Sequence, residues 1–203
     1  MWALVEDNAI VKMINNPKGM VIGDTRYSRN IFSFRWTNEE REAIGLYEVV
    51  FDNSNKKDEQ WYINTNQTFA FADDTVTASY GSATPKAHAD TLWTAQDETD
   101  GKGIEGEVAT RGLKYNLIQT VKQQAAGLLQ DTDWYVVRKA DAGTAVPSAI
   151  TTHRAAVRTK ADEMETSITN ASDTPALETL YTYTKQEDGS ITRPLGEIPV
   201  KEF

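Results

Sequence analysis

The first eighty residues carry short apolar runs and period-two alternation of the kind found in β-strands. Apolar runs occupy residues 9–14 and 46–51, and residues 68–80 alternate between apolar and polar side chains around a turn at Asp73-Asp74. A period of two places alternate side chains on the same face of a half-buried strand, and adjacent Asp residues favour a turn. The pattern predicts a small antiparallel β domain over residues 1–81.

One short helix is expected to interrupt these strands. In the segment TNEEREAIG, Thr37 stands at the N-cap position and Glu40 three residues later, the spacing of a capping box. Gly45 follows where a glycine commonly ends a helix. The β domain is therefore predicted to contain a single short helix.

Aromatic residues are spread through this domain at strand spacing. Trp36 and Tyr47 are the two that we select as packing or interaction anchors. Aromatic side chains at this spacing are typical of a core or of a protein–protein contact. Exposed Trp and Tyr would also suit a carbohydrate-binding face, which stays open as an alternative.

From residue 82 to residue 109 the chain becomes rich in small, acidic and glycine residues. Few apolar side chains interrupt this stretch, so we interpret it as a long, partly extended connection. We expect partner chains to hold this connection and the segment 184–203, because glycine-rich connections and termini are poorly ordered unless they are tied down.

Helical periodicity begins at residue 110. Apolar residues recur every three or four positions in two stretches, which predicts two amphipathic helices packed as a hairpin within residues 110–180. A third, short helix is expected at residues 174–180, with Thr174 as its N-cap and Pro175 at its first position. The two long stripes consist of Leu113, Leu117, Val121, Ala125, Leu128 and Leu129, and of Ile150, Val157, Ala161, Met164 and Ile168.

The segment QDTDWYVVRKADAG joins the two long helices. We interpret Asp131 or Thr132 as the junction where one helix ends and the next is capped, with Asp133 favoured by the helix dipole. Trp134 is expected to face Leu128 and Leu129 as a packing anchor. Residues 181–203 then form an extended β hairpin, turning at Asp188-Gly189, and a proline-containing arm. The predicted fold class is α+β.

Composition and charge narrow the function classes. The 203 residues include no cysteine and carry a formal net charge of −9. Lys and Arg are scattered among acids, which argues against nucleic-acid binding, since such proteins show a basic patch or stripe. No run approaches the roughly 20 apolar residues of a membrane helix. The first residues also lack the pattern of a secretory signal.

Motifs that would support catalysis or cofactor binding are weak. The glycines of GKGIEG lack the preceding apolar strand that a dinucleotide site needs. Glu98, Asp100 and Glu107 fall at positions three, five and twelve of a possible weak calcium loop counted from Gln96. The two histidines, His88 and His153, assemble no triad or metal site. We therefore expect no enzyme activity and no cofactor.

The helical segment resembles a stretch found in tail proteins of tailed bacteriophages. There a run of the form LL..TDW...R leads to VP and then to YRAAVR. The matching residues here are Leu128, Leu129, Thr132, Asp133, Trp134, Arg138, Val146, Pro147, Arg154, Ala155, Val157 and Arg158, with His153 in place of the Tyr. The run at Trp36, Glu39, Glu40, Gly45, Leu46, Tyr47 and Val49 is similar to another run in the same group.

The resemblance implies a virion protein of a phage tail, assembled in the host cytoplasm, that contacts other tail proteins and copies of itself. A structural subunit of the baseplate or of the tail-fibre attachment is one alternative. A tail-fibre assembly chaperone that is not retained in the virion is the second. A carbohydrate-binding receptor protein is the third. The resemblance supplies no catalytic residues.

Overall fold

The computed structural model describes residues 1–201. The chain divides into two compact units, Met1–Thr84 and Pro85–Phe203. The strands and helices of the first unit are β1 (Trp2–Glu6), β2 (Ala9–Ile14), β3 (Met20–Ile22), β4 (Thr25–Tyr27), η1 (Arg29–Phe32), α1 (Asn38–Glu42), β5 (Leu46–Asp52), β6 (Tyr62–Ile63), β7 (Thr68–Ala72) and β8 (Thr75–Ser79).

The first unit is built on a five-stranded sheet with the order β2-β1-β5-β8-β7. The prediction of an antiparallel domain is wrong at one pairing, because β5 and β8 run parallel. Residues 53–74 separate these two strands, enough chain for the crossover that a parallel pair requires. Period-two alternation does not report strand direction. The edge strands β2 and β7 also contact each other, so the sheet is curled.

Side chains on both faces of the sheet of this unit are buried, in two clusters. Val49 and Val76 are opposite each other in the parallel pair and are almost fully buried. Tyr47 packs edge-on against Phe71 with ring centroids 4.8 Å apart. A second cluster gathers Trp36 and other aromatic side chains around Leu46. Tyr47 and Trp36 are thus partly buried and pack against these clusters.

The predicted short helix and turn are both present. In α1 the backbone N–H of Glu40 donates to the Thr37 hydroxyl, and the Thr37 N–H donates to the Glu40 carboxylate at 2.8 Å. Asp73 and Asp74 form the β7–β8 turn with φ angles of 49° and 54°. The additional 3₁₀ helix η1, whose N-cap is Ser28, was not predicted.

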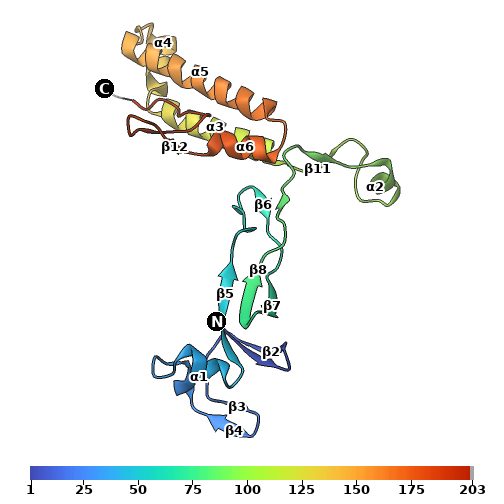
Figure 1. The fold of residues 1–203 in the computed structure, drawn as a ribbon. Helices are drawn as coiled ribbons and strands as arrows, with labels where there is room; N and C mark the ends of the chain where they lie inside the picture. Colours follow the sequence, from blue (N-terminus) through green and yellow to red (C-terminus); the bar gives the residue numbers. More distant parts are fainter. Residues whose placement is uncertain (202–203) are drawn as a thin grey trace. The chain divides into compact units, whose positions relative to one another are not determined.

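The second unit contains the longer helices. Its elements are β9 (Thr84–Pro85, at the unit boundary), β10 (Thr91–Leu92), α2 (Ala95–Thr99), β11 (Val108–Thr110), α3 (Leu113–Gln130), α4 (Asp133–Ala142), α5 (Ser148–Asn170), α6 (Thr174–Tyr181), β12 (Thr184–Lys185) and β13 (Ile191–Thr192). Helices α3 and α5 lie side by side and form the main contact of this unit (Figure 1).

The helical stripes meet as predicted. Val121 and Ala125 of α3 are buried, and Val157 and Met164 are among the α5 residues that are almost fully enclosed. The prediction that Thr174 is the N-cap of α6 is wrong. Asp173 is the N-cap, and its carboxylate accepts a hydrogen bond from Ala176 N at 2.8 Å.

The predicted connection over residues 82–109 contains a folded lobe. Its short helix α2 begins with a capping box, in which the Asp97 N–H donates to the Thr94 hydroxyl and the Thr94 N–H donates to the Asp97 carboxylate. Strands β10 and β11 pair, and the ring of Trp93 lies directly against Gly103, where a Cβ atom would meet it at 2.3 Å. Hydrogen bonds from Thr94 and then from Lys102 lower the pKa of Asp97 to about 2.

The lobe is closed where it joins α3. The Asp90 carboxylate accepts hydrogen bonds from Gly112 N at 2.8 Å and from Arg111 at 2.6 Å. The hydrogen bond from the Gly112 N–H, and to a smaller extent that from Arg111, holds the pKa of Asp90 below its ordinary value. Contacts within this chain thus connect the lobe to the start of α3. That partner chains hold this segment stays a prediction.

Candidate interaction site of the helical unit

A buried arginine joins α5 to the junction between α3 and α4. Arg154 is only 7% exposed, and its Nη1 donates to the Leu129 carbonyl at 2.8 Å and to the Thr132 hydroxyl at 2.6 Å. Its Nη2 lies 2.8 Å from a carboxylate oxygen of Asp133. We call Arg154 with these three partners the arginine clamp.

The clamp fixes the direction in which α4 leaves the end of α3. The Thr132 hydroxyl, which is fully buried, also donates to the Leu129 carbonyl at 2.9 Å. Thr132 makes no side-chain cap for α4, so its hydroxyl serves the junction and not the helix start. The predicted junction is confirmed, with Asp131 as the C-cap of α3 and Asp133 in the first turn of α4.

Helix α4 directs large apolar side chains into solvent. Trp134 is 51% exposed and Val137 is 65% exposed, and no residue of α4 is buried. The prediction that Trp134 is a packing anchor on Leu128 and Leu129 is therefore wrong for the isolated chain. These leucines are themselves half-buried.

Trp134 is nevertheless held in place. Its ring lies 4.0 Å from that of Tyr135, and the guanidinium of Arg138 lies 4.6 Å from the Trp134 ring centroid. A ten-residue helix is below the length at which helices are stable alone in water. The exposed face of α4 is thus a candidate contact surface, positioned by the arginine clamp.

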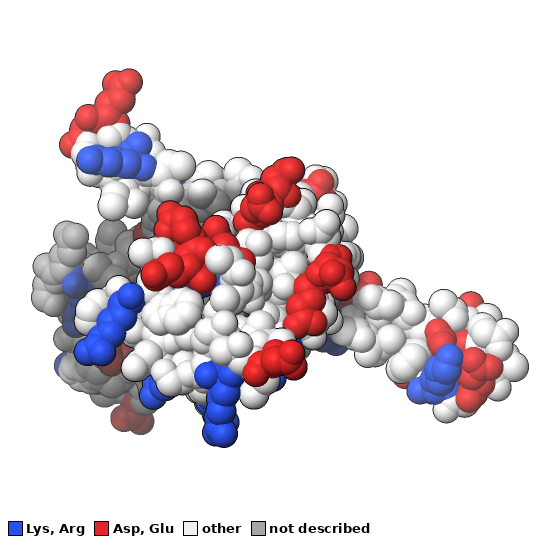
Figure 2. Space-filling model, turned by 60° about the horizontal axis from the view of Figure 1, so that its bottom comes forward, with Lys and Arg blue, Asp and Glu red and all other residues white. Residues whose placement is uncertain are grey.

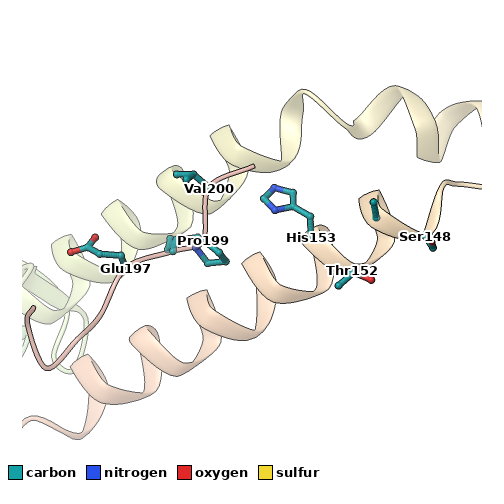
Figure 3. A pocket seen from close by; sticks show the side chains of 8 residues that line it. Ser148, Thr152, His153, Glu197, Pro199 and Val200 are labelled. Atoms are coloured by element: carbon teal, nitrogen blue, oxygen red, sulfur yellow. The ribbon is translucent and has the colours of Figure 1, made fainter. Parts of the chain in front are cut away.

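A second feature is the C-terminal strap, which we define as residues 193–200. Leu195 and Ile198 of the strap are 2% and 9% exposed, and Leu195 N donates to the Leu180 carbonyl at 3.0 Å. The strap runs between α3 and α5 (Figure 3). It borders an open hollow of about 800 Å³ that is also lined by Thr152 and His153.

An aromatic and ionic latch holds the start of the strap. Arg193 Nε and Nη2 lie 2.8 and 2.9 Å from the two carboxylate oxygens of Glu197. The guanidinium of Arg193 lies 5.2 Å from the rings of both Tyr181 and Tyr183. The Tyr183 hydroxyl donates to Glu197 at 2.6 Å, which raises the pKa of Tyr183. The strap is thus seated on the helices of its own chain.

The acidic residues of the possible calcium loop are not brought together. Gln96 and Glu98 lie in α2, and Asp100 is its C-cap, so a helix occupies the start of the predicted loop. Lys102 Nζ lies 3.0 Å from the carboxylates of both Asp97 and Asp100. Within residues 1–201, no three acidic, His or Cys side chains gather as a metal site, so Glu98, Asp100 and Glu107 do not form a calcium loop here.

Surface charge is mixed. On the face drawn in Figure 2, Lys and Arg side chains stand apart from one another among Asp and Glu side chains. Among the helices of the described chain, none has the length and apolar character needed to cross a membrane.

The chain exposes more surface than compact domains of its mass. Its accessible area is 13320 Å² for a mass of 22.6 kDa. The area of a compact monomer scales with mass, which gives about 9,500 Å² for one such domain and about 11,400 Å² for two separate domains of the sizes found here. The excess over two domains is roughly 1,900 Å².

Comparisons with protein-family models, with curated proteins and with solved structures found no match for this chain.

Proposed function

We propose that this protein is a non-enzymatic structural subunit of a bacteriophage tail, acting through protein–protein contacts in the baseplate or at the fibre attachment. The observation that carries the proposal is the arginine clamp together with the exposed face of α4. Both lie in the segment 128–158, which is the stretch that resembles phage tail proteins.

The clamp gives that resemblance a physical basis. Thr132 and Asp133 belong to the first half of the resembling stretch, and Arg154 belongs to the second half. A side chain that holds both halves together maintains one orientation of α4. A contact helix held in one orientation loses less conformational entropy when a partner binds.

The large accessible area also supports the proposal that this protein is a subunit of a larger assembly. Surface in excess of two compact domains is available for contacts with neighbours without opening either core. On this proposal, the first unit docks on the tail, and the helical unit contacts neighbouring copies or other tail proteins.

Quantitative mass spectrometry of gradient-purified particles, with isotope-labelled peptides of this chain as standards, tests the proposal. A structural subunit is present at a fixed copy number per particle. A chaperone, our second candidate, is absent or below stoichiometric amounts, because it leaves the fibre after assembly. The exposed α4 face would serve that role equally well.

Paired variants connect the result to the surface. Val137→Asp places a charge on the exposed face of α4, and Ala156→Asp makes a similar change at an exposed position of α5. We expect Val137→Asp to lower incorporation into particles and Ala156→Asp to leave it unchanged. Equal incorporation of both variants would remove α4 from the contact surface.

The half-exposed Trp134 is one observation that favours the carbohydrate-binding alternative. Glycan-array binding by the free protein that is lost in Trp134→Ala would favour that alternative over the structural subunit.

A further inference from the structure

We infer that the C-terminal strap is exchangeable between copies: residues 193–200 can leave the groove of their own chain and occupy the same groove of a second copy. The inference concerns the pure protein and does not depend on the proposed function. It rests on how the strap is seated and on how it is connected to α6.

The seat of the strap is specific and compact. Its contacts are the buried side chains of Leu195 and Ile198, the hydrogen bond from Leu195 N to Leu180, and the close approach of Gly196 to Lys160. A strap from a second copy would make the same contacts in the same groove. Exchange therefore leaves the enthalpy of the seat unchanged, as in other exchanges of identical elements.

The connection between α6 and the strap makes few stabilising contacts that opening would break. Every residue from Thr182 to Thr192 is exposed, and these eleven residues include the small hairpin of β12 and β13. Gln186 hydrogen-bonds to Thr184 and Thr192 within the hairpin. Two-stranded hairpins are at best marginally stable in water, so opening this one costs little.

An open hairpin gives the strap reach. In the hairpin, its two ends lie about one strand spacing apart, roughly 5 Å. Eleven extended residues span roughly 36–40 Å, which is sufficient to reach a groove on an adjacent copy.

The latch is only partly preserved on exchange. Arg193 and Glu197 are both in the strap and would move with it, whereas Tyr183 lies in the connection. The Arg193–Glu197 pair is thus retained on exchange, and the hydrogen bond from Tyr183 to Glu197 has to break or reform between chains.

Concentration decides which arrangement dominates. A short flexible connection keeps the strap at an effective concentration of about 1 mM near its own groove. A dilute solution at about 10 µM therefore contains mainly the closed monomer, whereas exchange becomes substantial near 1 mM or among copies held side by side.

Cysteine cross-linking of the full chain provides the test, since the sequence contains no cysteine. Thr152 and Val200 line the same hollow and are exposed, so neither is a seat residue. Thr152→Cys and Val200→Cys chains are unfolded together in urea, refolded at about 1 mM or about 10 µM, and treated with a short bis-maleimide. We expect a covalent heterodimer at the high concentration and its loss at the low one.

Two controls make the outcome decisive. A chain carrying both changes reports that the sites are within reach by cross-linking within one chain at low concentration. A mixture of Val50→Cys, at an exposed position of β5, with Thr152→Cys measures random collision. The inference is overturned if the heterodimer of the strap pair does not exceed that background at the high concentration while the doubly substituted chain cross-links internally.

A stapled hairpin gives a second, independent measurement. Lys185 and Ile191 are directly paired across β12 and β13, so Lys185→Cys with Ile191→Cys forms a disulfide that keeps the hairpin closed. Light scattering after refolding at high concentration should show dimers of the reduced variant and monomers of the oxidised variant. Dimers in equal amount under both conditions would contradict exchange through this hairpin.

Discussion

Replacing Thr132 by Val tests the arginine clamp most sharply. The substitution keeps the volume of a fully buried side chain and removes only its hydroxyl. That hydroxyl accepts from Arg154 at 2.6 Å and donates to the Leu129 carbonyl at 2.9 Å.

The expected magnitude follows from these two bonds. A hydrogen bond to a charged group contributes about 1.5–3 kcal/mol and a neutral one about 1 kcal/mol. Arg154 retains Leu129 and Asp133 as partners after the change, so part of its charge stays satisfied. We expect Thr132→Val to lower the free energy of unfolding of the helical unit by about 2–3 kcal/mol.

A double-mutant cycle separates the clamp from the rest of the packing. In an Arg154→Met background the Thr132 hydroxyl still donates to Leu129, so Thr132→Val should cost only about 1 kcal/mol there. The coupling energy of about 1–2 kcal/mol lies in the range found for residues that share a network.

The assay is urea unfolding of the full chain followed by far-ultraviolet circular dichroism, whose helical signal comes mainly from the second unit. Thr166→Val is the matched control, because Thr166 is exposed on α5 and bonds only its own helix, at Asp162. It should change stability by less than about 0.5 kcal/mol. Equal costs of Thr132→Val in both backgrounds would refute the clamp.

Three further predictions concern packing, backbone and pH. Met164→Ala should destabilise the helical unit by about 2–5 kcal/mol, since Met164 is 2% exposed. Trp134→Ala should cost at most about 1 kcal/mol, because Trp134 is half-exposed. Thermal melts of the two variants compare these costs. Gly127→Ala in α3 should stabilise by about 0.5–1 kcal/mol in urea unfolding, because a Cβ there meets nothing within 4 Å. Because the pKa of Asp97 is lowered in the folded lobe to about 2, its contribution is complete above the ordinary value of 3.8 and is lost as the pH falls from there toward 2. The protection factor of the Thr94 amide, which is its exchange rate relative to that of an unstructured peptide at the same pH, should fall over that window. Asp97→Asn should remove this pH dependence of the protection factor.

The long helices and most strands of the fold were predictable from periodicity. The stripes containing Val157 and Met164 repeat every three or four residues, and that spacing alone defines which face is buried. The capping box at Thr37 was also predictable, since it depends on residues close in sequence.

What the sequence did not predict depends on contacts distant along the chain. The parallel pairing of β5 with β8 is a matter of topology that alternation does not encode. The exposure of Trp134 depends on the direction that the clamp gives to α4. That direction depends on the contact between Asp133 and Arg154, which are 21 residues apart in the sequence.

Two local signals were present and were missed. Arg154 interrupts the apolar stripe of α5 between Ile150 and Val157, and a charged residue on a buried stripe indicates a buried partner. The Thr94-x-x-Asp97 spacing is a helix-start signal inside a polar segment. The first signal concerns the residue that positions α4, and the second concerns the start of α2 in the lobe.

The copy number of this chain in purified phage particles tests the central proposal most directly. The account predicts a fixed, integer number of copies per particle, measured against isotope-labelled peptides and unchanged when particles are purified again. Absence from the particle, or an amount that falls with each purification, would contradict a structural subunit and would favour the assembly chaperone.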